Sequence, residues 1–177
     1  MTKLERGFIQ IFTGNGKGKT TAAIGQAVRA AGAGLKSYII QFMKKFPYSE
    51  LVSLKNLDEW IMIEQCCKDD FVLKREPAPK EEIEKAKHAL STTSEKMLSG
   101  NFDLIILDEV CVAIHFGLLK VEDVLSVLDS KPESVELILT GRYCPQPLID
   151  RADLVTEMKE VKHYYQNGIL ARKGIES

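Results

Sequence analysis

The sequence lacks any long apolar run, since no stretch approaches the roughly 20 consecutive apolar residues that a membrane-spanning helix needs. It also lacks an excess of either charge, because 24 Lys and Arg residues oppose 25 Asp and Glu residues and leave a net charge of -1. A chain without a basic excess has no general attraction for nucleic acid or for an anionic membrane surface. These absences predict a soluble protein that binds neither nucleic acid nor a membrane.

Cysteine patterns typical of metal sites are also missing. The four cysteines form no C-x-x-C pair and have no histidine at a zinc-ligand spacing; they are Cys66, Cys67, Cys111 and Cys144. Residues 1–6 are charged and do not resemble a secretory signal peptide. We therefore expect reduced thiols and a cytoplasmic location.

What is present is the composition of a globular domain. Apolar residues make up 45% and charged residues 28% of the 177 residues, which is ordinary usage. No repeat, low-complexity segment or linker divides the chain. Residues 1–177 are therefore expected to form a single domain.

Short apolar runs alternate with helical patterns along the chain. Strands are expected at residues 8–12, 37–42, 60–64, 102–107, 135–139 and 154–158. Helices are expected at residues 20–32, 80–99, 121–128 and 145–152. Residues 43–58 are expected to be irregular, and residues 66–79 to form a long functional loop. This alternation predicts a three-layer α/β domain with a mostly parallel sheet.

A glycine-rich segment joins the first expected strand to the first expected helix. Its end, Gly18-Lys19-Thr20, matches the close of a P-loop, in which backbone amides and the helix N-terminus bind phosphate. Lys19 supplies a positive charge, and the Thr20 hydroxyl can bind Mg²⁺. The residues expected to bind the ATP phosphates are Gly14, Asn15, Gly16, Lys17, Gly18, Lys19, Thr20 and Thr21.

The segment departs from the standard P-loop at two positions. Thr13 stands where the motif has its first glycine, and a second lysine, Lys17, lies inside the loop. Lys17 has two interpretations, a phosphate ligand or a solvated surface charge. Both departures suggest a loop that holds the triphosphate differently from ordinary ATPases.

Two further candidate residues follow the apolar strand at residues 104–107. Asp108 and Glu109 fit the Walker-B pattern, in which the aspartate holds Mg²⁺, directly or through a water, together with the P-loop hydroxyl of Thr20. Glu109 would orient a water or contact substrate or ribose. The alternative is a buried strand that merely ends in acidic residues.

Arg142 follows the fifth expected strand, and ligands of open α/β sheets bind at the carboxyl ends of the strands. Arg142 is thus expected to reach phosphate, with a surface salt bridge as the alternative. The candidate catalytic set is Lys19, Thr20, Asp108, Glu109 and Arg142, and the candidate metal ligands are Thr20 and Asp108.

Together these motifs resemble the P-loop-type ATP:corrinoid adenosyltransferases, also called cob(I)alamin adenosyltransferases. The similarity covers essentially the whole chain, in residues 13–23, 41–42, 103–109, 139–142, 148–158, 161–163 and 174–176. It implies a P-loop NTPase (RecA-like) fold and transfer of the 5′-deoxyadenosyl group of ATP to the Co(I) centre of a corrinoid, with triphosphate as the leaving group. It further implies Mg²⁺, a homodimer, a nucleotide held in reverse orientation, and a flavoprotein that reduces Co(II) to Co(I).

Two segments depart from the family pattern. Members commonly carry Phe-Thr-Trp after the third strand, where this chain has Phe71-Val72-Leu73. The resemblance assigns corrinoid contacts to Phe71 and Leu73. The usual Lys-Gly after Gln41-Phe42 is altered as well.

Two other functions compete with adenosyl transfer. One is an ordinary P-loop ATP hydrolase or phosphotransferase that attacks the γ-phosphate. The other is a non-catalytic ATP- and corrinoid-binding module. The products formed from ATP distinguish the three.

Overall fold

The computed structural model describes residues 4–44 and 48–176, except for the side chains at positions 73 and 74. Its sheet has six parallel strands in the order β3-β2-β4-β5-β1-β6. The strands are β1 (Ile9–Thr13), β2 (Ser37–Phe42), β3 (Ile61–Cys66), β4 (Leu104–Asp108), β5 (Glu136–Thr140) and β6 (Leu154–Glu157). The predicted parallel α/β architecture is confirmed.

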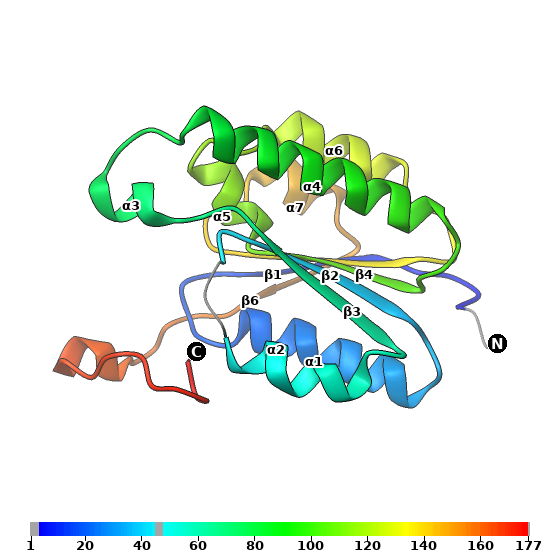
Figure 1. The fold of residues 1–177 in the computed structure, drawn as a ribbon, viewed down its shortest axis with the longest axis horizontal. Helices are drawn as coiled ribbons and strands as arrows, with labels where there is room; N and C mark the ends of the chain where they lie inside the picture. The colour runs from blue at the N-terminus through cyan, green and yellow to red at the C-terminus, as the bar shows by residue number, and fades with distance from the viewer. Residues whose placement is uncertain (1–3, 45–47, 177) are drawn as a thin grey trace.

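Helices cover both faces of this sheet and create the three predicted layers. They are α1 (Lys19–Gly32), α2 (Ser49–Leu54), α3 (Asp70–Lys74), α4 (Lys80–Leu98), α5 (Val110–His115), α6 (Val121–Asp129) and α7 (Gln146–Arg151), with the 3₁₀ helices η1 (Lys55–Leu57) and η2 (Tyr164–Asn167). Figure 1 shows α1 and α2 on one face of the sheet and α4 to α7 on the other. No helix in the described part of the chain is both long and apolar enough to cross a membrane.

The core divides between the two faces of the sheet. β4 is buried along its whole length, and successive side chains of a strand point to opposite faces. Ile105 and Leu107 pack in the cluster under α4 and α6, whereas Leu104 and Ile106 pack with the alanines of α1. Burial on both faces explains why this strand is a continuous apolar run.

Residues 43–58 were expected to be irregular, and this prediction was wrong for residues 49–57, while residues 45–47 lie outside the described residues. α2 and η1 occupy residues 49–57. Leu51, Leu54 and Leu57 recur every third residue, which is a helical spacing. Leu54 is only 4% exposed and packs with Leu57 in the core on the α1 side of the sheet.

The expected long loop at residues 66–79 was wrong in part, because it contains α3. The helix ends at Arg75, which has a left-handed backbone (φ 56°). The Arg75 amide donates to the Val72 carbonyl, and the Glu76 amide donates to the Phe71 carbonyl. Phe71 is buried and anchors the helix to the core. Tertiary packing of one aromatic ring thus ordered a segment with little helical periodicity.

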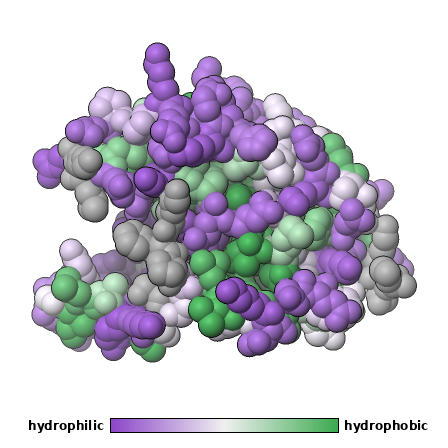
Figure 2. Space-filling view, in the orientation of Figure 1, coloured by the Kyte–Doolittle hydropathy of each residue, from purple (hydrophilic) through white to green (hydrophobic). Residues whose placement is uncertain are grey.

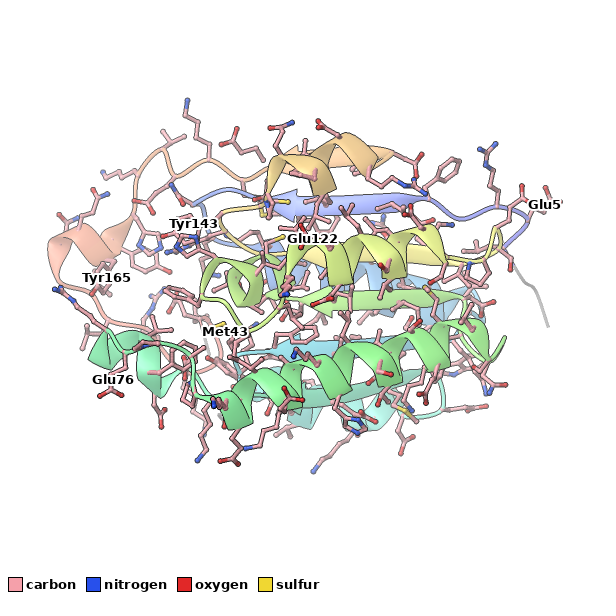
Figure 3. The ribbon with its side chains drawn as sticks, turned by 90° about the horizontal axis from the view of Figure 1, so that it is seen from above. Glu5, Met43, Glu76, Glu122, Tyr143 and Tyr165 are labelled. Carbon is pink, nitrogen blue, oxygen red and sulfur yellow. The ribbon has the colours of Figure 1, made fainter. Side chains whose placement is uncertain are left out.

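The carboxyl ends of the six parallel strands lie at one edge of the sheet. The turn from β1 to α1, the helix α3 and the C-terminal segment all lie at the left of Figure 1. Seen from above, Met43, Tyr143 and Tyr165 lie toward that same end, far from Glu5 (Figure 3). Motifs that are distant in the sequence therefore meet at this edge.

Candidate functional site

The glycine-rich loop curves around the Lys19 ammonium group, which hydrogen-bonds two of its carbonyls. Its Nζ donates hydrogen bonds of 2.8 Å to the carbonyls of Gly14 and of Gly16. Gly18, with φ at 116°, precedes the first turn of α1 in a backbone conformation that favours glycine. Burial lowers the pKa of Lys19, although Glu109 favours its charged form. The ammonium lies where an anion at the helix N-terminus would meet it.

The segment after β6 supports this loop from behind. The Gly16 amide donates a 2.6 Å hydrogen bond to the Met158 carbonyl. A Cβ atom added at Gly16 would lie 2.6 Å from that same oxygen. The loop and Met158 are therefore in backbone contact, which leaves no room for a side chain.

We expect Gly16→Ala to weaken ATP binding at least about tenfold and to lower the melting temperature, because the loop must move away from Met158. The matched control is Gly25→Ala in α1, where a Cβ meets nothing within 4 Å. That change should stabilise the protein by about 0.5–1 kcal/mol, because alanine has a higher helix propensity than glycine. Calorimetric melting and ATP titration would measure both variants, and equal behaviour would contradict the packing argument.

Thr13, the departure from the standard motif, ties the loop to the neighbouring strand. Its hydroxyl donates a 2.9 Å hydrogen bond to the Gly141 carbonyl beyond β5. The Thr13 side chain is buried. A threonine at this position thus fixes the start of the loop to the segment that carries Arg142.

Asp108 is the centre of a buried hydrogen-bond network. It is 1% exposed, and its Oδ1 accepts from the hydroxyls of Thr20 (2.8 Å) and Thr140 (2.6 Å). Its Oδ2 accepts from Lys44 Nζ (2.7 Å) and Gln41 Nε2 (3.2 Å). The Thr20–Asp108 pair predicted from the sequence is therefore assembled, with three donors that the prediction did not include.

Thr140, Gln41 and Lys44 were not predicted as members of the site. Gln41 is a fully buried polar residue near the carboxyl end of an apolar strand, β2, and that position was the available signal. Burial works against the Lys44 ammonium, but the charge and hydrogen bond of Asp108 outweigh it and raise the pKa of Lys44. Lys44 carries no local signal, because its partners Thr20 and Asp108 lie 24 and 64 residues away.

Glu109 is held toward the cleft by an unusual backbone. Its φ is 60°, a left-handed conformation that costs a residue with a side chain about 1–2 kcal/mol. The Glu109 amide donates a 2.9 Å hydrogen bond to the Thr140 hydroxyl, which stabilises this turn. Burial, followed by the charge of Asp108, raises the pKa of the Glu109 carboxyl. Backbone strain together with a disfavoured charge is common at functional positions, so Glu109 remains a candidate.

We expect Glu109→Gln to raise the melting temperature at neutral pH while lowering activity. The folded-state pKa of Glu109 lies above the unfolded value, so its charge penalises folding fully above the folded pKa and not at all below the unfolded one. The stabilisation should therefore shrink as the pH falls toward about 4.5, near the ordinary glutamate pKa. Melting curves from pH 4.5 to 8 would test this, with Glu95→Gln on the exposed side of α4 as control. A gain that does not change with pH would contradict the assigned cause.

A cleft of about 590 Å³ opens beside the glycine-rich loop, large enough for a nucleotide. Residues 16–21 line one wall, and Glu109 and Arg142 line another. Gly14 and Asn15 do not line it: Gly14 packs behind the loop on Met158, and Asn15 is exposed. A notch at the left edge of Figure 2 separates the upper helices from the C-terminal segment.

The C-terminal segment contributes to the lining of this cleft. His163, Ile175 and Glu176 are among its lining residues. The Glu176 carboxylate accepts hydrogen bonds from Arg172 and from the Tyr164 hydroxyl, which fold the segment back on itself. Arg172 and then Tyr164 hold the pKa of Glu176 down, to about 2. The segment thus presents the Glu176 carboxylate to the cleft.

A second cleft of about 280 Å³ adjoins the first. Its lining includes the apolar side chains of Met43, Val72, Val112 and Phe116. The two clefts share Lys44, Tyr48, Glu109 and Arg142. Arg142 is exposed and, among the described residues, has no salt-bridge partner. This placement supports the cleft-facing interpretation of Arg142 over that of a surface ion pair.

The structure describes only one of the two side chains, Phe71 and Leu73, that the family resemblance assigned to the corrinoid. Phe71 is 4% exposed and packs edge-on against Phe116, with ring centroids 6.4 Å apart. It therefore contacts the second cleft through Phe116 and does not line it directly. The side chain of Leu73 lies outside the described part of the structure.

The fold and the phosphate loop define the class of this protein, a P-loop NTPase with a RecA-like α/β domain. A KaiC-like protein from Pyrococcus horikoshii has a similar structure, with a TM-score of 0.56, 18% identity, and coverage of 86% of this chain and 73% of that one. The RadB recombinase matches with a TM-score of 0.58, 11% identity, and coverage of 90% and 78%. At these identities the likeness shows the fold alone.

Sequence comparison identifies the family. Residues 5–177 match the family described as ATP:corrinoid adenosyltransferase BtuR/CobO/CobP. The chain is 38% identical over 175 residues to the corrinoid adenosyltransferase CobA of Salmonella typhimurium, covering 97% of this chain and 86% of that protein. It is 32% identical over 173 residues to the corrinoid adenosyltransferase of Pseudomonas aeruginosa, with coverage of 97% and 84%. The chain belongs to the ATP:corrinoid adenosyltransferase family.

Proposed function

We propose that this protein transfers the 5′-deoxyadenosyl group of ATP to the Co(I) centre of a corrinoid. In this reaction a cobalt–carbon bond forms, the C5′–oxygen bond of ATP breaks, and triphosphate leaves. The observation that carries the proposal is the junction of the phosphate-loop cleft with a partly apolar cleft in a chain of this family. Two substrates in adjoining clefts are what a direct group transfer requires.

The phosphate-loop cleft supplies the charges for the leaving group. Co(I) is itself a strong nucleophile, so the protein has no need to provide one. Lys19, Arg142 and the amides of residues 16–21 surround the cleft in which the triphosphate would lie. Fixed positive groups of this kind stabilise the negative charge that develops on a leaving group.

Thr20 and Asp108 are the residues that would hold Mg²⁺. Their donors are a hydroxyl and a carboxylate, the oxygen ligands that Mg²⁺ prefers. The structure supports a cation at this position, because the Lys44 ammonium lies within 2.9 Å of Thr20 Oγ1 and 2.7 Å of Asp108 Oδ2. Bound Mg²⁺ would neutralise charge on the phosphates.

We assign one face of the corrinoid to the second cleft, because this cleft adjoins the phosphate-loop cleft and is partly apolar. Met43, Val112 and Phe116 offer apolar surface to the ring, and Phe71 supports Phe116 from behind. We include Phe71 and Leu73 as tentative corrinoid contacts on the strength of the family resemblance. Glu109 and Arg142 stand where the two substrates would meet.

We further propose a single cytoplasmic domain over residues 1–177, a homodimer, and a flavoprotein that supplies Co(I). All six described strands belong to one sheet, which supports a single domain. The C-terminal segment leaves Val161 and Leu170 91% and 71% exposed. We place the proposed homodimer contact at these exposed apolar side chains.

The test is an anaerobic incubation of the protein with ATP, Mg²⁺ and chemically reduced cob(I)alamin. Adenosylcobalamin by absorbance, together with triphosphate by chromatography, is the expected result. ADP and phosphate without a corrinoid product would instead establish the hydrolase or phosphotransferase alternative. Binding of both ligands without any product would leave the non-catalytic module.

A further inference from the structure

A lysine ammonium lies between the two oxygen ligands assigned above to a divalent cation. Lys44 Nζ is 2.9 Å from Thr20 Oγ1 and 2.7 Å from Asp108 Oδ2. The contact is well shielded from solvent, since the side chains of Lys44 and Asp108 are 12% and 1% exposed. The ring centroid of Tyr48 lies 5.5 Å from the same nitrogen, a further favourable contact for a cation.

We propose that Lys44 is a built-in cation that competes with Mg²⁺ for Thr20 and Asp108, and so sets how strongly metal binding and nucleotide binding depend on each other. The inference rests on the proposed nucleotide site. It does not require that the corrinoid reaction occurs.

The competition follows from charge and from shared ligands. A divalent cation bound to Thr20 Oγ1 and Asp108 would lie against the ammonium, and like charges at contact distance in a buried site repel strongly. The metal therefore binds only if the ammonium withdraws from Thr20. Asp108 retains donors without Lys44, because Thr140 and Gln41 also bind it.

The displaced ammonium has a place to go. Lys44 lines both the phosphate-loop cleft and the second cleft. While no metal is bound, its positive charge adds to that of Lys19 and Arg142 on the same cleft. Lys44 should therefore assist the binding of metal-free ATP and oppose the binding of the metal.

The experiment compares the dissociation constant of ATP in EDTA with that in saturating MgCl₂, by calorimetric titration without corrinoid. We expect Lys44→Met to weaken metal-free binding and to leave Mg²⁺-ATP binding equal or tighter. The ratio of the dissociation constant in EDTA to that in MgCl₂ should rise about tenfold, within the range usual for coupled sites. By linkage, the Mg²⁺ affinity of the ATP complex should rise by the same factor.

Two variants control for general charge effects. Lys17→Met removes an exposed charge from the same cleft without touching Thr20 or Asp108. It should change both constants alike and leave their ratio at the wild-type value. Lys44→Arg keeps the charge and should bind metal-free ATP more tightly than Lys44→Met does.

The proposal fails if the ratio is unchanged or lower in Lys44→Met, or if Lys17→Met raises it equally. Lys44→Gln, which can still donate to Asp108, replaces the methionine variant if melting shows that the latter does not fold. Failure of wild-type protein to bind ATP would remove the nucleotide site and this inference together. ATP binding with the expected ratios but without adenosylcobalamin would overturn the proposed reaction and leave the role of Lys44 standing.

Discussion

Replacing Lys19 with alanine is expected to abolish measurable adenosyl transfer, with a fall in kcat/KM for ATP of roughly 100- to 1000-fold or more. The change removes the ammonium that faces the phosphate-loop cleft. It also removes the two hydrogen bonds that hold the carbonyls of Gly14 and Gly16. The loop therefore loses both its charge and its internal support. Initial rates at varied ATP, with excess cob(I)alamin, would measure the loss.

Lys17→Ala is the matched control, because it removes a lysine from the same loop. Lys17 is exposed and lines the cleft, and an exposed charge contributes little energy through a high dielectric. Its loss should lower kcat/KM by no more than about tenfold on that argument. Equal losses in the two variants would show that the total charge of the loop matters and that the position of Lys19 does not.

Asp108→Ala is expected to have the largest combined effect, with activity lost and the free energy of unfolding lowered by about 3–5 kcal/mol. Breaking a buried ion pair by removing one partner costs about that much. The substitution strands the Lys44 ammonium, which is 12% exposed at its side chain. It also leaves the hydroxyls of Thr20 and Thr140 without their carboxylate acceptor. Urea denaturation would give the stability change directly.

Asp103→Ala is the matched control, because Asp103 directly precedes β4 and Asp108 ends it. The Asp103 carboxylate accepts a 2.8 Å hydrogen bond from the Lys36 amide, and it lines neither cleft. Loss of one such bond costs about 1 kcal/mol, and activity should persist. An Asp108→Ala protein as stable as Asp103→Ala would contradict the network described for Asp108.

Most of the strands and the longer helices were predictable, because their signals are local. β4 is a continuous apolar run, and α6 repeats apolar residues at Val121, Val124 and Leu128. α2 and α3 were missed because they are short and depend on tertiary anchoring by Leu54 and Phe71. The leucine spacing of α2 covers too few turns to establish a helix by itself, and α3 has little helical periodicity.

The candidate site divides in the same way. The P-loop and the Walker-B aspartate are contiguous motifs, so their residues and their meeting at the carboxyl edge of the sheet follow from sequence and topology. The assembled Thr20–Asp108 pair agrees with that expectation. Lys44 and Gln41 lie outside both of these motifs.

The sequence by itself determined the parallel α/β fold, the phosphate loop and the family, because each depends on spacing within a short stretch or on similarity along the chain. Only the tertiary structure decided that Lys44 lies on Thr20 and Asp108, that Met158 supports the loop, and that Glu176 faces the cleft. These contacts join residues brought together by the order of strands in the sheet and by the path of the C-terminal segment. Local spacing does not encode such distances, because they exist only once the sheet has formed.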